Sequence, residues 1–321
     1  MKFESILSSK TAWKVLGVLF RRPWDEFYLR MLVKELKASP NIVHRTLKLL
    51  EKEQMLISKK VGNTVTYKIN GNSSMAQKLF LLHHENRLQE LPPEFLVYIN
   101  KIRRKLQKNT LSVVLYGSVA KGTNVKESDI DIAIIHEGKI DEDVFRDMFA
   151  EHLRYVQTVC FTPSQFNELY GKGSEFIRSL VKSGIIIHDR DFFYKYVFMP
   201  LPKPSKAYIE NLLKQVKEDI KHLWEIYREN KLPVDGMLYP MFRKLSIALL
   251  LLNRQIPESR RDVFEKLGKI GEKKLCAYLS RTKKSWDGRM DKIKKSDEEN
   301  MLKLSEDKLS ECYTKLEEYD G

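Results

Sequence analysis

The sequence contains few cysteines and no long apolar run. Its three cysteines, Cys160, Cys276 and Cys312, lie far apart and in no spacing typical of a metal site. We therefore expect ordinary thiols of a reducing cytoplasm. No apolar stretch approaches the roughly 18–20 residues of a membrane span, and the first residues lack the basic and apolar segments of a signal peptide. These absences predict a cytoplasmic protein with no membrane partner, and 321 residues with 42% hydrophobic content allow two or three folded domains.

The positive charge is concentrated near the N-terminus. The chain carries a net charge of +14, and residues 1–70 hold fourteen Lys and Arg against six Asp and Glu. Residues 71–200 are nearly balanced, with seventeen against sixteen. A basic N-terminal module predicts a polyanionic partner, of which DNA is the usual one. The alternative is a basic surface that is merely solvated.

Apolar periodicity predicts three helices and a hairpin in the first seventy residues. Residues 11–20, 29–36 and about 40–54 have apolar side chains at helical spacing. Ser39 and Pro40 fit an N-cap followed by proline at the first helical position. Two alternating β-prone runs then flank Gly62 and Asn63, which is typical of a β-hairpin.

This order of elements, over about residues 8–70, resembles the winged helix-turn-helix family of transcription regulators. The resemblance implies that the third helix enters the major groove of double-stranded DNA and that the hairpin wing follows the backbone. Winged helices also serve as protein-interaction modules, and regulators of this family commonly form homodimers, so both possibilities stay open. The DNA-binding residues that the resemblance implies are Asn41, His44, Arg45 and Lys48 on the third helix and Lys59, Lys60 and Lys68 on the wing.

Taken over its whole length, the sequence predicts an α+β multidomain protein. Residues 1–72 form the winged helix-turn-helix, and residues 73–92 a linker helix that ends at two prolines. Residues 93–202 are expected to form a small mixed-sheet domain, and residues 203–321 a C-terminal helical bundle of antiparallel helices.

The residues with the clearest chemistry lie in the mixed-sheet domain. An apolar run of strand length ends at Gly117 and Ser118, where the backbone and a hydroxyl can approach a phosphate. Ten residues later Asp129 and Asp131 open a second strand, on which alternation directs both carboxylates to one face. Two carboxylates so placed can share hard cations such as Mg²⁺, or Mn²⁺ in its place, with substrate phosphates.

This spacing resembles the DNA polymerase β-like nucleotidyltransferase superfamily, in particular its small and kanamycin-nucleotidyltransferase-like members. The resemblance covers about residues 93–200. It implies that Asp129 and Asp131 are catalytic and hold metal, and that Gly117, Ser118 and Lys121 bind the nucleoside triphosphate. Lys121 stands where a basic residue commonly follows the Ser-x-Ala element in that family.

One departure from the family pattern concerns the next strand. Active members usually carry a third carboxylate there, whereas this chain has Gln157, which cannot accept a proton. Asp141, Glu142 and Asp143 are possible substitutes, but acidic residues at this position are typical of a helix start. The departure puts catalysis, rather than the fold, in question, and it is compatible with binding of a nucleotide and a metal.

Three hypotheses follow from these patterns. The first is an enzyme that transfers a nucleotide from a nucleoside triphosphate to an acceptor such as a protein, an RNA or a small molecule. The second is a transcriptional regulator whose inactive nucleotidyltransferase domain senses a nucleotide. The third is a module of the toxin–antitoxin type that binds or modifies a protein partner.

Overall fold

The computed structural model describes residues 9–124, 128–140, 156–229, 234–258, 260–288 and 293–319, and the chain divides into two compact units. The first unit spans Met1–Glu168 and Ser179–Leu201, and the second spans Leu169–Arg178 and Pro202–Gly321. In the part of the chain that is described, no helix has both the length and the apolar character needed to cross a membrane.

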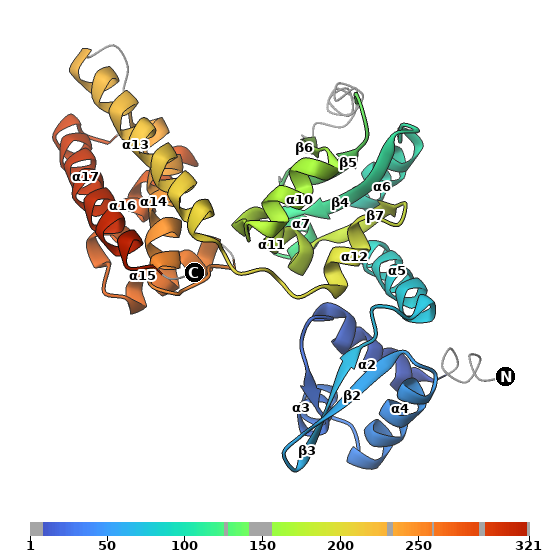
Figure 1. The fold of residues 1–321 in the computed structure, drawn as a ribbon. Coiled ribbons are helices and arrows are strands. Elements are labelled where there is room, and N and C mark those ends of the chain that lie inside the picture. The colour runs from blue at the N-terminus through green and yellow to red at the C-terminus, as the bar shows by residue number, and fades with distance from the viewer. Residues whose placement is uncertain are drawn as a thin grey trace. The chain divides into compact units, whose positions relative to one another are not determined.

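The first unit begins with helices and a small antiparallel sheet, drawn in blue in Figure 1. Its elements are α2 (Lys10–Arg21), β1 (Phe27–Tyr28), α3 (Leu29–Leu36), α4 (Pro40–Lys52), β2 (Leu56–Val61) and β3 (Thr64–Ile69). The strand order is β1-β3-β2, and the hairpin turns at Gly62, whose φ is +58°. The three helices bury one apolar face each, for example through Leu16, Leu32 and Leu47.

Local sequence explains where these helices begin and end. The Ser9 hydroxyl accepts a hydrogen bond from the Ala12 N–H at 3.1 Å and so caps α2. Pro40 is the first residue of α4, as its position after Ser39 predicts, although the Ser39 side chain makes no capping bond. The helix ends at Lys52, before the predicted end near residue 54, because Gln54 has a left-handed φ of 56°. Membership of the winged-helix family stays a prediction.

The four-stranded sheet carries the Gly-Ser and Asp-x-Asp motifs. Its strands are β4 (Thr110–Tyr116), β5 (Ile130–His136), β6 (Val156–Phe161) and β7 (Ile185–Asp189). The helices that precede, connect and follow these strands are α5 (Ser74–Gln89), α6 (Pro93–Arg104), α7 (Gly117–Lys121), α10 (Pro163–Gly171), α11 (Glu175–Ser183) and α12 (Phe193–Phe198). The order is β6-β5-β4-β7, in which β5 runs parallel to β6 and β4 runs antiparallel to both β5 and β7. The sheet is therefore mixed, as the sequence predicts.

The central strands of this sheet are apolar almost throughout. Val113, Val114 and Leu115 of β4 are completely buried, as are Ile132 and Ile134 of β5. Such continuous burial is typical of strands that are covered on both faces. Helix α6 ends at Arg104, and the Lys105 N–H closes its last turn by donating to the carbonyls of Lys101 and Ile102.

The second unit is helical beyond residue 205 and is drawn in yellow to red in Figure 1. Its helices are α13 (Lys206–Glu229), α14 (Asp235–Leu252), α15 (Arg260–Lys269), α16 (Lys273–Trp286) and α17 (Lys295–Glu317). Helix α14 packs against the other four, and every residue from 245 to 252 is buried. Glu175 accepts hydrogen bonds from Arg243 Nη2 at 2.8 and 3.1 Å and so attaches α11 to α14.

Candidate active site

The two aspartates lie at the start of β5, beside the turn that follows β4. Ile130 and Ile132 are buried, whereas Asp129 and Asp131 remain partly exposed, so alternation directs the carboxylates away from the core. In the sheet register Asp131 pairs with Tyr116 of β4 on one side and with Gln157 of β6 on the other. Residues from three strands therefore form one row across the sheet.

Gly117 is packed directly against Asp131. Its φ is +75°, a backbone conformation that side chains disfavour. A Cβ atom at this position would lie 1.9 Å from Asp131 Oδ2 and 2.8 Å from its Cγ. Any other residue here would adopt a disfavoured φ and would have to displace the Asp131 carboxylate. The predicted phosphate-binding turn and the predicted metal ligand thus lie in direct contact.

Gln157 binds the other aspartate. Its Nε2 donates a hydrogen bond to Asp129 Oδ2 at 2.9 Å. A neutral amide therefore stands at the edge of the site where the family resemblance leads us to expect a carboxylate. The suggested substitutes, Asp141, Glu142 and Asp143, lie outside the described residues. Within the described ranges, no three His, Cys, Asp or Glu side chains gather in a group that could hold a metal ion.

Tyr116 is a residue of the candidate site that the sequence does not single out, because it is simply the last residue of the apolar run before Gly117. Burial and the nearby charge of Asp131 raise the pKa of its phenol well above the usual value, so the group stays protonated at neutral pH. The signal available in the sequence was its position directly before Gly117. Its neighbour Asp131 could be found only from the register of β4 against β5.

Ser118 and Lys121 occupy the short helix α7, but they lie at different ends of it. Ser118 follows Gly117 and is partly buried. Lys121 ends the helix, and its Nζ donates to the Ser179 hydroxyl of α11 at 3.2 Å. The structure thus brings Gly117, Asp129 and Asp131 together with Gln157, while Lys121 faces α11.

The predicted DNA-binding residues lie on the surface of the N-terminal region. Those on α4 are all exposed, and Lys48 also forms an ion pair with Glu51 at 2.9 Å. On the hairpin, Lys59 and Lys60 are exposed and Lys68 is half-buried. The residues concerned are Asn41, His44, Arg45, Lys48, Lys59, Lys60 and Lys68. DNA binding by this surface stays a prediction.

Comparison with known proteins supports the reading of the mixed-sheet domain. Residues 100–193 match the family model for polymerase beta nucleotidyltransferases. Two Methanocaldococcus jannaschii proteins, both provisionally named protein adenylyltransferases, are similar to this chain. The first is 29% identical over 150 residues, which is 44% of this chain and 90% of the relative. The second is 28% identical over 93 residues, which is 28% of this chain and 91% of the relative.

Solved structures give a weaker likeness. The spectinomycin adenyltransferase AAD(9) of Enterococcus faecialis, solved with ATP and spectinomycin, is 12% identical and aligns with 67% of this chain and 99% of its own. The TM-score is 0.41. The family-model match and the two sequence relatives, together with the motif spacing, identify residues 100–193 as a domain of the polymerase β-like nucleotidyltransferase superfamily.

Proposed function

We propose that the protein transfers an adenylyl group from ATP to a hydroxyl group on a protein. The contact between Gly117 and Asp131 carries this proposal, because it joins a turn suited to phosphate to a carboxylate suited to metal. The choice of ATP and of a protein acceptor is supported by the names of the two Methanocaldococcus jannaschii relatives.

The residues present fit a divalent cation. Asp129 and Asp131 supply two carboxylates on the same side of β5, and Mg²⁺ or Mn²⁺ accepts such oxygen ligands together with phosphates and water. The Gln157 Nε2–H donates a hydrogen bond to one oxygen of Asp129, which orients that carboxylate and leaves the second oxygen of Asp129 for a cation. When bound, the ion would neutralise the triphosphate and polarise the phosphorus under attack.

The chain's own residues then have distinct tasks in the proposed reaction. Gly117 allows the backbone to approach the triphosphate, and Ser118 offers a hydroxyl beside it. The acceptor oxygen forms a bond to the α-phosphorus as the bond to pyrophosphate breaks, and the acceptor proton must leave. Because Gln157 cannot take that proton, Asp129 and Asp131 are the groups of this described site that can.

A transfer assay tests the proposal. The full chain is incubated with Mg²⁺, ATP labelled at the α-phosphate and a cell extract that supplies protein acceptors. We expect labelled protein with the native chain and none with an Asp129→Asn, Asp131→Asn variant. Asp307→Asn, an exposed carboxylate on α17, is the matched control and should retain transfer. Equal labelling by the native chain and the double variant would refute the proposal.

One observation favours a second candidate, a regulator that binds ATP without turning it over. The Gln157 amide bound to Asp129 is compatible with nucleotide binding but supplies no general base. This candidate predicts ATP binding without label transfer and DNA binding that changes when ATP is added. Absence of DNA binding even at low salt would exclude it.

A further inference from the structure

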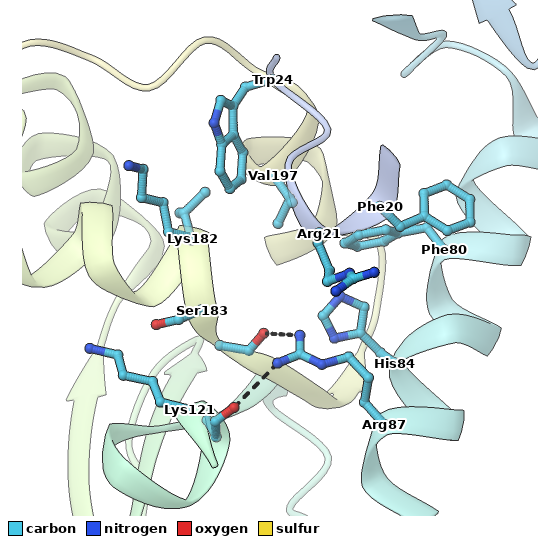
Figure 2. A pocket seen from close by; sticks show the side chains of 13 residues that line it. Phe20, Arg21, Trp24, Phe80, His84, Arg87, Lys121, Lys182, Ser183 and Val197 are labelled. Atoms are coloured by element: carbon cyan, nitrogen blue, oxygen red, sulfur yellow. Dashed lines mark hydrogen bonds between the residues drawn. The ribbon is translucent and has the colours of Figure 1, made fainter. Parts of the chain in front are cut away.

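A cavity of about 320 Å³ lies at the end of α7 that is opposite Gly117 (Figure 2). Helices α2, α5, α7, α11 and α12 contribute to its walls, so residues of the N-terminal region and of the nucleotidyltransferase domain meet around it. Its volume is within the range of small-molecule sites, roughly 300–1,000 Å³. The cavity is separate from the row formed by Tyr116, Asp131 and Gln157 across the sheet.

Positive charge is the first property of this cavity. Arg21, Arg87, Lys121 and Lys182 line it, and no aspartate or glutamate is found among the described residues of its wall. Figure 2 shows Arg21 and Arg87 on one side and the two lysines on the other. A concave surface lined by one sign of charge concentrates counter-ions. The ligand that fits is therefore an anion.

Arg87 is held rigidly in this arrangement. Its guanidinium donates to the carbonyl oxygens of Ala120 at 3.3 Å and Gly184 at 3.4 Å. Burial lowers its pKa, Arg21 lowers it further, and Glu90 opposes both effects. An anion between the two arginines would relieve their repulsion without requiring Arg87 to move.

Aromatic rings are the second property. Trp24 is half-buried in the wall, and the Lys182 ammonium lies 5.9 Å from its ring centroid. Phe20 and Phe80 make an edge-to-face contact, with 5.5 Å between their ring centroids. Such a wall can accept a planar ring, and a nearby cation can hold a phosphate that is linked to that ring through a sugar.

We propose that this cavity is a second nucleotide site, separate from the transfer site at Asp129 and Asp131. The arginines and lysines hold the phosphates, and the aromatic wall around Trp24 holds the base. Because α2 contributes Arg21 and the nucleotidyltransferase domain contributes Lys121 and Lys182, the bound nucleotide links the two regions.

Binding to the full chain tests the proposal. The Asp129→Asn, Asp131→Asn variant is titrated with a non-hydrolysable ATP analogue in the absence of Mg²⁺, which removes the metal-dependent site. We expect one bound analogue per chain. Arg21→Gln with Lys182→Gln, which removes one cation from each side of the cavity, should weaken this binding about tenfold or more. Arg30→Gln with Lys195→Gln removes two exposed cations outside the cavity and should leave it unchanged.

Several results would overturn the proposal. The first is no metal-independent binding. The second is equal affinity in the cavity variant and its control, with circular dichroism confirming that both are folded. Pyrophosphate, used as a probe without a base, should bind more weakly than the analogue; equal affinity would rule out a nucleotide. If the transfer assay fails and this binding persists, only the proposed transfer function is refuted.

Discussion

Replacement of Gly117 by alanine is the sharpest test of the geometry at the active site. The new Cβ would lie 1.9 Å from Asp131 Oδ2, well inside contact distance. A side chain at the left-handed φ of +75° costs about 1–2 kcal/mol. Displacing the carboxylate or the backbone adds about 1–3 kcal/mol, as overpacking usually does. We therefore expect Gly117→Ala to lower the free energy of unfolding by about 2–5 kcal/mol.

Gly122 provides a matched control at the other end of α7. Its φ is +66°, and no atom lies within 4 Å of a Cβ built there. Gly122→Ala should therefore lose only the backbone contribution of about 1–2 kcal/mol. Urea denaturation of both variants measures the difference, and adenylyl transfer should be lost only in Gly117→Ala. Equal destabilisation by the two substitutions would refute the steric argument.

A double-mutant cycle with Asp131→Ala isolates the contact itself. Removal of the carboxylate eliminates the two shortest contacts, although the Cβ of residue 131 would remain 3.1 Å away. In this background Gly117→Ala should be nearly as mild as Gly122→Ala, with a coupling energy of about 1–3 kcal/mol. A penalty that is the same in both backgrounds would show that Asp131 does not limit the space at Gly117.

Three further substitutions test other parts of the molecule. Gln157→Glu replaces the donor to Asp129 by a third carboxylate, so it should reduce stability without metal by about 1 kcal/mol and tighten Mg²⁺ binding measured by calorimetry. His83→Leu should reduce the loss of stability between pH 7 and pH 5, measured by urea denaturation. Burial, and after it the charges of Arg87 and Arg21, lower the pKa of His83 in the folded protein to about 4. The stability that depends on neutral His83 is therefore complete above the pKa that His83 has in the unfolded chain, and it is lost as the pH falls toward 4. Arg45→Glu should weaken DNA binding and reduce the slope of log K against log salt by about one, measured by fluorescence anisotropy.

Each of these substitutions has a result that would contradict it, and Gln157→Glu and Arg45→Glu also have a matched control. For Gln157→Glu, Gln157→Ala removes the same hydrogen bond without adding charge, and equal Mg²⁺ affinity in the two variants would refute the prediction. For His83→Leu, an unchanged difference in stability between the two pH values would show that His83 does not titrate as its burial predicts. For Arg45→Glu, the control is Lys52→Glu, an exposed charge on the same helix outside the predicted contacts. Equal loss of DNA binding in both would exclude a specific role for Arg45.

Much of the fold around the active site follows from local sequence. The apolar run before Gly117 and the alternation after Asp129 place two strands correctly, because burial on both faces and side-chain alternation are properties of a single strand. The sequence likewise indicates a close approach to the backbone at Gly117, but it does not indicate the contact with Asp131. The predicted end of α4 was less accurate, since the left-handed backbone at Gln54 stops the helix and apolar periodicity does not reveal that geometry.

The remaining features depend on contacts between distant segments. Tyr116 and Gln157 flank Asp131 only because the register of three strands brings them there. Arg21 of α2 and Lys182 of α11 are separated by most of the first unit's sequence, yet both line one cavity. No pattern within α2 or α11 indicates that Arg21 and Lys182 line the same cavity, so the cavity could not be predicted from the sequence.

The proposed transfer site and the proposed second nucleotide site share α7, a helix of only five residues. Gly117 at its start contacts Asp131, and Lys121 at its end lines the cavity. A ligand that holds Lys121 would therefore restrain the Gly117 turn, which faces the nucleotide in the proposed transfer site. Linkage requires that each ligand change the affinity of the other by the same factor, typically about 5-fold to 150-fold. We expect Arg21→Gln with Lys182→Gln to change the KM for ATP in the transfer assay, whereas Arg30→Gln with Lys195→Gln does not. Identical KM values in the two variants would show that α7 does not couple the sites.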